Sequence, residues 1–138
     1  MSKEEVELFR KLNKLSKSIK VLEEVEVKRI VSNGKIVIVV GKGQAARFIG
    51  KNGANIKKLK KFLKKSIKVV EEDTDIKTFV QSMIFPIPVL GVNIMYGENE
   101  RYIIRIPKVE ERNLPLRSNE ITNVCKSLFE RDFEVRLE

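Results

Sequence analysis

The sequence predicts an α+β protein made of two similar units in tandem, each with the element order α-β-β-α-α-β. Three observations support this prediction. Pairs of apolar runs rich in β-branched residues are joined by glycine-containing turns, which is typical of β-hairpins. Amphipathic helical patterns lie on both sides of each pair. A shift of the sequence by 66 positions places the apolar pattern of 36–72 on that of 102–138 without a gap, which indicates an internal repeat.

The first unit, residues 1–72, begins with a capping box formed by Ser2 and Glu5, and apolar residues at helical spacing continue from it. Two β-rich runs then flank Asn33 and Gly34, a pair that is typical of a tight hairpin turn. The predicted elements, in chain order, are a helix at about 3–17, strands at 21–31 and 35–40, a short helix at 44–49, a helix at about 54–65 and a strand at 66–71.

The second unit, residues 73–138, repeats this pattern. Asp73 or Thr74 can cap a helix that ends at Pro86, and the turn at 97–99 joins two apolar runs. The predicted elements are this helix, strands at 89–96 and 101–106, a helix at 120–129 and a strand at 133–137. A chain of 138 residues with 42% hydrophobic residues suffices for two very small domains.

A short loop of the first unit carries the clearest functional pattern. Gly50 and Gly53 bracket Lys51 and Asn52 directly before a lysine-rich helix. Two glycines at this spacing let the backbone approach a sugar–phosphate chain where a Cβ atom would collide with it. The N–H groups of 54–57, at the start of the helix, point toward an anion. Lys51 adds a positive charge, and Asn52 tolerates a left-handed conformation and can donate a hydrogen bond. A GxxG sequence by itself is more often a plain helix–loop–helix turn.

The charge distribution favours a polyanion as the partner of this loop. Residues 1–72 carry 19 Lys and Arg against 8 Asp and Glu, a net charge of +11, whereas 73–138 carry 9 against 11, a net charge of −2. The segment 35–70 contains 11 basic residues and no acidic one. A basic run by itself is equally consistent with a solvated face, but a block of one sign beside a glycine loop favours a polyanion.

The helix at 54–65 has an apolar face and a basic face. The apolar face is predicted to be core and comprises Ile56, Leu59, Phe62 and Leu63. Lys57 and Lys58 lie in the first turn, where the helix dipole disfavours cations, so their presence favours an anionic partner. Arg47 and Lys42 precede the loop and are the next candidates.

Nucleic-acid bases are expected in a groove between the helices that flank the loop and the strand at 66–70. Ile49, Ala46 and Ile67 are candidates for its apolar lining, although each is equally consistent with buried core. The sequence places no aromatic residue beside the loop as a stacking platform.

The second unit lacks the glycines of the first. The loop 50–53 corresponds to 116–119, where Leu116 stands in place of Gly50 and Pro115 in place of Ile49. We expect Leu116 to obstruct the close backbone approach that Gly50 permits. Together with the net charge of −2, this predicts that binding is carried mainly by the first unit.

The sequence I-G-K-N-G before a lysine helix, in an α-β-β-α-α-β unit, resembles the KH domain in its type II order, whose GXXG loop binds about four nucleotides. Two such units filling the chain resemble the KH pair of NusA, and especially the short archaeal NusA-like transcription factors. The resemblance implies two type II KH domains, 1–72 with an intact loop and 73–138 with a degenerate one, each a three-stranded sheet packed against helices. The implied nucleic-acid-binding residues are Lys42, Arg47, Ile49, Gly50, Lys51, Asn52, Gly53, Ala54, Lys57 and Lys58.

Catalytic and metal-binding patterns are nearly absent. The chain has no His and a single cysteine, Cys125, at a core position of a helix. The carboxylates at 71–75 are consistent with a metal site, but solvation of a linker between two units is the better interpretation. The glycine spacing at 43–51 matches neither a P-loop nor a dinucleotide-binding fingerprint. We therefore expect no enzymatic activity, no cofactor and no small-molecule substrate.

The sequence predicts a cytoplasmic protein, since no apolar run is long enough to span a membrane and the N-terminus lacks the apolar segment of a signal peptide. The predicted function is single-stranded RNA binding, with the nascent transcript as target, in transcription elongation or termination. The alternative is an interaction module that docks on RNA polymerase, the ribosome or an RNA-processing complex, with RNA contact secondary. A third possibility is a subunit of an RNA-processing enzyme that lends RNA affinity through the same site without doing chemistry itself.

Overall fold

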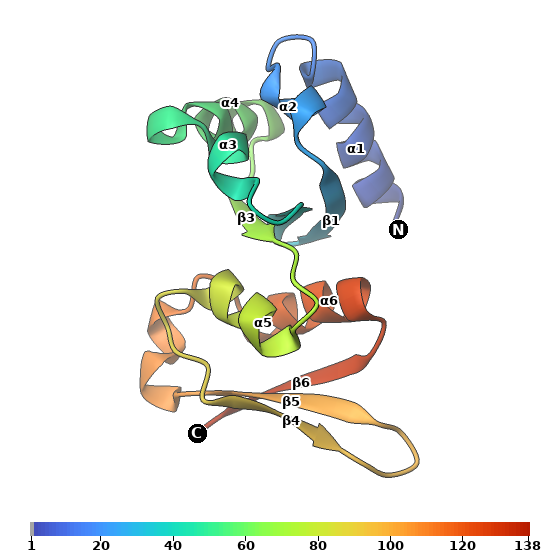
Figure 1. Cartoon of the computed structure of the whole chain (residues 1–138), viewed down its shortest axis with the longest axis vertical. Coiled ribbons are helices and arrows are strands. Elements are labelled where there is room, and N and C mark those ends of the chain that lie inside the picture. Colours follow the sequence, from blue (N-terminus) through green and yellow to red (C-terminus); the bar gives the residue numbers. More distant parts are fainter. Residues whose placement is uncertain (1) are drawn as a thin grey trace. The chain divides into compact units, whose positions relative to one another are not determined.

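The computed structural model describes residues 2–138, and the chain divides into two compact units, residues 1–72 and 73–138, which are described separately (Figure 1). Across the described residues each unit contains one three-stranded sheet packed with helices. The α+β class predicted from the sequence is confirmed. No helix within 2–138 combines the length and the apolar character needed to cross a membrane.

In the first unit the strand order is β1-β2-β3, with β1 and β2 antiparallel and β2 and β3 parallel. The hairpin predicted at Asn33-Gly34 joins β1 to β2, and Gly34 has φ +86°. The elements are α1 (Lys3–Leu15), α2 (Val21–Glu24), β1 (Val27–Asn33), β2 (Lys35–Val40), α3 (Ala45–Ile49), the 3-10 turn η1 (Lys51–Gly53), α4 (Ala54–Leu63) and β3 (Ile67–Glu71).

The predicted N-cap of α1 is present, since the backbone N of Glu5 donates to the Oγ of Ser2 at 3.2 Å. The strand predicted at 21–31 is wrong in its first part, because 21–24 form the helical turn α2. The backbone N of Val25 donates to the carbonyl of Val21, and the side chains of Val21 and Leu22 pack against the core. Tertiary packing of these two side chains therefore overrides their β propensity. As a result, α2 brings Glu24 into an ion pair with Arg47 of α3.

The core of the first unit lies between its sheet and its helices. Ile36 and Ile38 of β2 pack with Leu12 of α1, Phe48 of α3 and Leu59 of α4. Phe48 and Leu59 are completely buried, and burial of one such side chain contributes about 1.5–3 kcal/mol to stability. These two side chains hold α3 and α4 against the sheet, so the loop between the two helices has a fixed support.

In the second unit the strand order is β4-β5-β6 with the same pattern of one antiparallel and one parallel pairing, and α5 and α6 cover one face of the sheet (Figure 1). The β2–β3 register, from Ile36↔Ile67 to Val40↔Glu71, recurs 66 positions later as Tyr102↔Phe133 to Ile106↔Leu137. The elements are α5 (Ile76–Ile84), β4 (Gly91–Met95), β5 (Arg101–Ile106), the 3-10 helix η2 (Lys108–Asn113), α6 (Ser118–Phe129) and β6 (Asp132–Leu137).

Two details of the second unit differ from the prediction. The cap of α5 is Asp75, whose carboxylate accepts from the backbone N of Thr78 at 3.0 Å, rather than Asp73 or Thr74. The 3-10 helix η2 lies between β5 and α6, where no element was predicted from the sequence. Leu114 follows it in an extended conformation, as is favoured for a residue before proline, and Pro115 ends the helical segment.

Candidate nucleic-acid interface

The loop that carries the two glycines joins α3 to α4 through the single turn η1. Gly50 has φ +83° and ψ 167°, a conformation that is essentially restricted to glycine. Asn52 (φ 56°) and Gly53 (φ 72°) are both left-handed. The backbone N of Gly53 donates to the carbonyl of Gly50 at 3.0 Å, which closes the turn. Asn52 thus adopts the left-handed conformation that an asparagine was expected to tolerate.

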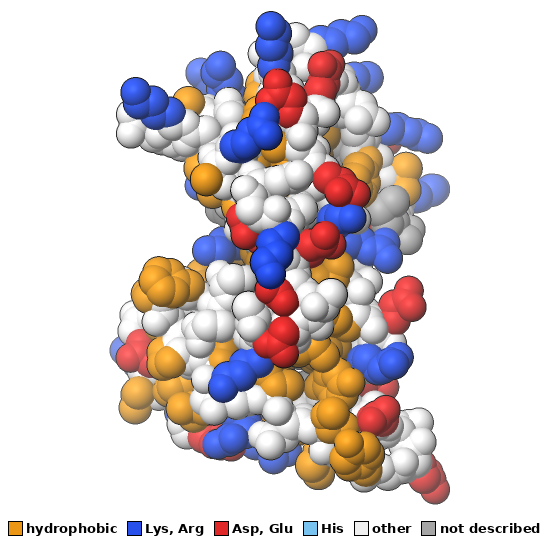
Figure 2. Space-filling view, in the orientation of Figure 1, with side chains coloured by type: hydrophobic (Ala, Val, Ile, Leu, Met, Phe, Trp, Pro, Cys, Tyr) orange, Lys and Arg blue, Asp and Glu red, His pale blue; other side chains and the backbone are white. Residues whose placement is uncertain are grey.

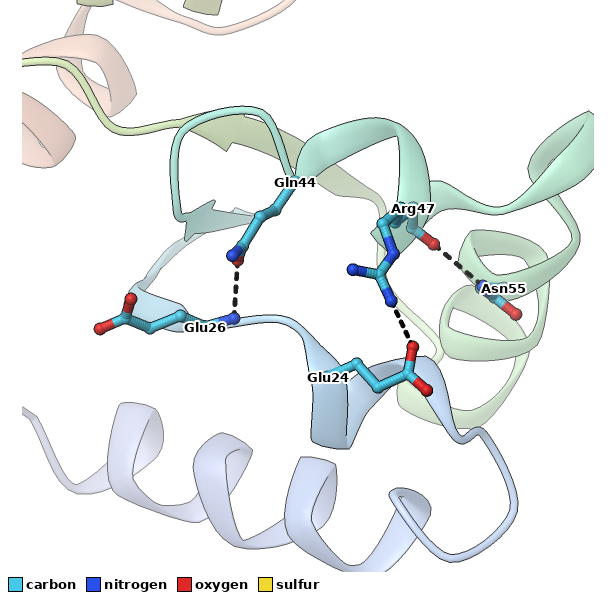
Figure 3. A network of polar contacts seen from close by, with 5 residues as sticks. All are labelled: Glu24, Glu26, Gln44, Arg47 and Asn55. Carbon is cyan, nitrogen blue, oxygen red and sulfur yellow. Dashed lines mark hydrogen bonds and ion pairs between the residues drawn. The ribbon is translucent and has the colours of Figure 1, made fainter.

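Asn55, which the sequence analysis missed, determines the shape of this loop. Its Nδ2 donates to the carbonyl of Arg47 at 3.3 Å and so connects the end of α3 to the start of α4 (Figure 3). A Cβ atom on Gly50 would lie 2.7 Å from the Asn55 Nδ2 and 3.0 Å from its backbone N. Gly50 is therefore required by contacts inside the protein, whatever ligand approaches. One indication of this role was present in the sequence: position 55 is polar, whereas the corresponding position of the second unit is the apolar Ile121.

We expect Gly50→Ala to lower the free energy of unfolding by about 1–3 kcal/mol, because alanine rarely adopts this conformation and its methyl group would displace the Asn55 amide. Gly43→Ala is the matched control, since Gly43 also has a positive φ (+81°) but a Cβ there meets nothing within 4 Å. Thermal or urea unfolding measures both. Equal losses of stability in the two variants would contradict this role of Asn55.

The positively charged candidates differ in how available they are. Lys51 at the tip of the loop and Lys57 and Lys58 in the first turn of α4 are exposed, and no carboxylate among the described residues pairs with them. Lys42 is exposed on the approach to α3. Arg47 forms an ion pair with Glu24 of α2, so part of its charge is compensated within the protein (Figure 3).

The remaining predicted site residues lie around the same loop. Ile49 is half-buried at the end of α3, and Ala54 is exposed at the start of α4. The backbone N of Ala54 donates to the carbonyl of Lys51, so the expectation that this N–H is free for an anion is wrong. What Ala54 provides is a small side chain beside the loop. Of the other lining candidates, Ala46 is exposed, whereas Ile67 belongs to the core and does not line a groove.

The start of α3 is held by two long-range hydrogen bonds. Gln44 Oε1 accepts from the backbone N of Glu26 at 2.8 Å (Figure 3), and the backbone N of Ala45 donates to Glu71 Oε2 at 3.1 Å. The N-terminus of α3 is therefore already occupied by a carboxylate of the protein, whereas the N-cap of α4, Gly53, has no side chain that could do the same. The two helix starts therefore differ, since only that of α3 carries a side-chain carboxylate.

In the loop 116–119 of the second unit, the prediction that Leu116 obstructs the surface is wrong. Leu116 is 1% exposed, so its side chain fills the core and does not obstruct the surface. Glu120 takes the position of Ala54 after the shift of 66, and its Oε1 accepts from the backbone N of Arg117 at 2.9 Å. Glu120 is buried, with 7% exposure. A carboxylate of the protein thus occupies the N-terminus of α6.

The carboxylates near the junction of the two units have structural roles. Glu71 binds the start of α3, Glu72 lies 3.6 Å from the Lys28 Nζ, and Asp73 accepts from the backbone N of Asp75. Hydrogen bonds from Thr78 hold the pKa of Asp75 below its ordinary value. Over residues 2–138 no cluster of His, Cys, Asp and Glu has the makings of a metal site.

Cys125 is fully buried in α6, as its sequence pattern predicted. Burial raises the pKa of its thiol to about 12, so the thiol stays protonated at neutral pH. A protonated thiol is a poor nucleophile, and the sequence contains no histidine that could deprotonate it.

Comparison with known proteins points to one family and one fold. A family model described as the KH domain matches residues 9–95, which include the whole loop. The crystal structure of APE1850 is similar to this chain with a TM-score of 0.74 and 19% sequence identity, covering 99% of this chain and 100% of that one. At this identity the similarity concerns the fold. A comparison with curated proteins gave no match.

Proposed function

Because the chain belongs to the KH domain family, we propose that it is a single-stranded RNA-binding protein that binds the sugar–phosphate backbone with the loop 50–53. KH domains bind single-stranded RNA, and their GXXG loop contacts about four nucleotides. The observation that carries the assignment to this loop is the glycine-specific turn at Gly50, which Asn55 supports from within the protein. Three exposed lysines without acidic partners among the described residues lie beside it: Lys51, Lys57 and Lys58.

The proposed binding mode follows from this arrangement. Lys51 and Asn52 project from the tip of the loop and contact the phosphates, and Lys57 and Lys58 add positive charge along the first turn of α4. Arg47 joins them by exchanging Glu24 for a phosphate. Ile49, on the side of α3, provides an apolar contact for a base. Single strands are preferred because their bases can be separated and turned toward the protein, which duplex RNA does not allow.

The finer part of the proposal is that the chain is a cytoplasmic, NusA-like factor with two KH domains in tandem, 1–72 and 73–138, that contacts the nascent transcript. The recurrence of the parallel strand register 66 positions later supports the tandem arrangement. We further propose that the second unit contributes little to RNA binding. Glu120 at the start of α6 supports this division, since its carboxylate stands where an incoming phosphate would have to lie.

The salt dependence of binding tests this proposal. A footprint that neutralises about three or four phosphates of a single strand should give a slope of log affinity against log salt concentration of about −2 to −3. Duplex RNA of the same length should bind more weakly. The measurement is a fluorescence anisotropy titration at several salt concentrations. A slope near zero, or a preference for duplex, would place the contact on another surface.

One observation favours the alternative function, docking on RNA polymerase, the ribosome or a processing complex. At the β4–β5 hairpin of the second unit, Met95 is 44% and Tyr96 is 79% exposed. Figure 2 shows hydrophobic side chains at the surface of the second unit and many Lys and Arg side chains on the first. Exposed apolar side chains are typical of protein contacts. A partner that co-purifies with the chain after nuclease treatment would favour this alternative.

A further inference from the structure

Phe62 lies at the surface, although its sequence pattern predicted that it belongs to the core. In α4, Leu59 is completely buried and Ile56 and Leu63 pack against the core, but Phe62 is 50% exposed. Among the apolar residues of α4, Phe62 is the large one that is exposed to solvent. Its exposure is not required by the fold, since the position 66 residues later holds Leu128, which is more buried.

The neighbours of Phe62 along α4 are basic, while Glu4 of α1 pairs with Lys65 just after the helix. Lys58 lies four residues before it and therefore on the same side of α4, one turn nearer the loop, and Lys61 is its neighbour in the chain. No Asp or Glu occurs anywhere in 35–70. In the second unit the position of Lys58 is taken by Val124, which is buried. The combination of an exposed ring and a lysine one turn away is therefore specific to the first unit.

This side of α4 begins at the loop. Asn55, which holds the loop closed, lies seven residues before Phe62, so two turns of helix, about 10 Å, separate the two side chains on one side of α4. A ligand that is bound at 50–53 and continues along α4 therefore passes Lys58 and then reaches Phe62.

We propose that Phe62 is a stacking platform for an unpaired base of the strand that the loop 50–53 binds, with Lys58 contacting the intervening phosphate. A flat apolar ring among lysines is complementary to a chain that carries both flat bases and negative charges, which is single-stranded nucleic acid. The proposal rests on the proposed RNA binding and extends its site beyond the loop, along α4.

The first test compares RNA lengths. Phe62→Ala should weaken the binding of a strand of about 12 nucleotides by about fivefold or more, the contribution of one stacked base. It should leave the binding of a strand of about four nucleotides, the span of the loop, nearly unchanged. Phe62→Trp should retain full affinity and Phe62→Leu should not, because leucine is apolar but has no ring. Equal affinity of Phe62→Ala and the unmodified protein for the longer strand would overturn the proposal.

The second test observes stacking directly. The chain has no Trp, so Phe62→Trp introduces a single indole whose fluorescence should be quenched when a base stacks on it. Tyr96→Trp, at the exposed hairpin of the second unit, is the matched control and should not be quenched. Quenching at Phe62→Trp should disappear when Lys51 and Asn52 are both replaced by Asp, since the loop then no longer holds the strand.

The two proposals fail in different ways. If the unmodified protein binds neither RNA length, RNA binding itself is wrong. Suppose instead that the unmodified protein binds both lengths and that replacing Lys51 and Asn52 by Asp abolishes this binding. If Phe62→Ala then keeps full affinity and Phe62→Trp shows no quenching, only the stacking platform is wrong. If Phe62→Ala keeps its RNA affinity but loses a protein partner from extract, the ring serves a protein contact instead, and the proposal is overturned.

Discussion

Replacement of Lys51 and Asn52 together by aspartate is expected to reduce RNA affinity at least about tenfold, more than about 1.4 kcal/mol, with an unchanged melting temperature. Both side chains are exposed at the tip of the loop, so the change places two carboxylates where the phosphates would lie. Asn52 is left-handed, with φ 56°, and aspartate also tolerates this conformation. Gly50 and Gly53 remain in place, and the variant should therefore fold normally.

A matched control separates a local effect from a general change in charge. Asn13 and Lys14, both exposed on α1, form a pair of the same residue types, and their replacement by aspartate changes the net charge by the same amount. If long-range attraction alone determines binding, the two double variants should lose similar affinity. A much larger loss for the loop variant, measured by anisotropy at about 0.15 M salt, supports direct contact. Full RNA affinity of a folded loop variant would exclude the loop as the binding site.

Ala54→Glu is expected to reduce RNA affinity by about tenfold or more while preserving or slightly raising stability. The variant places in the first unit the residue that the second unit has at Glu120, where a carboxylate caps α6. A negative charge in the first turn of a helix is favourable by about 0.3–1 kcal/mol, but it repels a phosphate at the same position. Stability and affinity should therefore change in opposite directions.

Ala54→Gln is the control for side-chain size, since it has nearly the same shape without the charge. It should lose clearly less affinity than Ala54→Glu, and the difference between the two should shrink as salt concentration increases. Parallel thermal unfolding and anisotropy titrations measure the two effects. Equal losses for the two variants would mean that size, not charge, controls this position, and Glu120 would then not explain why the second unit is expected to bind poorly.

The sequence by itself predicted the features that depend on local patterns. Apolar periodicity predicted the helices and strands other than α2 and η2, and Asn33-Gly34 predicted the β1–β2 hairpin, because a tight turn with positive φ is a local requirement. The GxxG sequence before a basic helix predicted the turn that joins α3 to α4. Each of these depends on residues that are close together in the chain, so no knowledge of the fold was needed.

Tertiary structure decided which side chains support the loop and which face solvent. The contact between Asn55 and Gly50, the ion pair between Arg47 and Glu24, and the turn α2 that positions Glu24 all depend on packing between elements. Helical periodicity assigned Phe62 to the core because it lies at the margin of the apolar face of α4. Only the position of the helix against the sheet decides whether such a marginal residue is covered.

The same reason explains the second loop. From the sequence, Leu116 was a bulky residue in place of Gly50, and Glu120 was one of several acidic residues in a unit with negative net charge. The direction in which a loop side chain points depends on the backbone path, which is set by what the neighbouring elements leave unfilled. In the folded unit that path buries Leu116 in the core and brings the Glu120 carboxylate onto the start of its own helix.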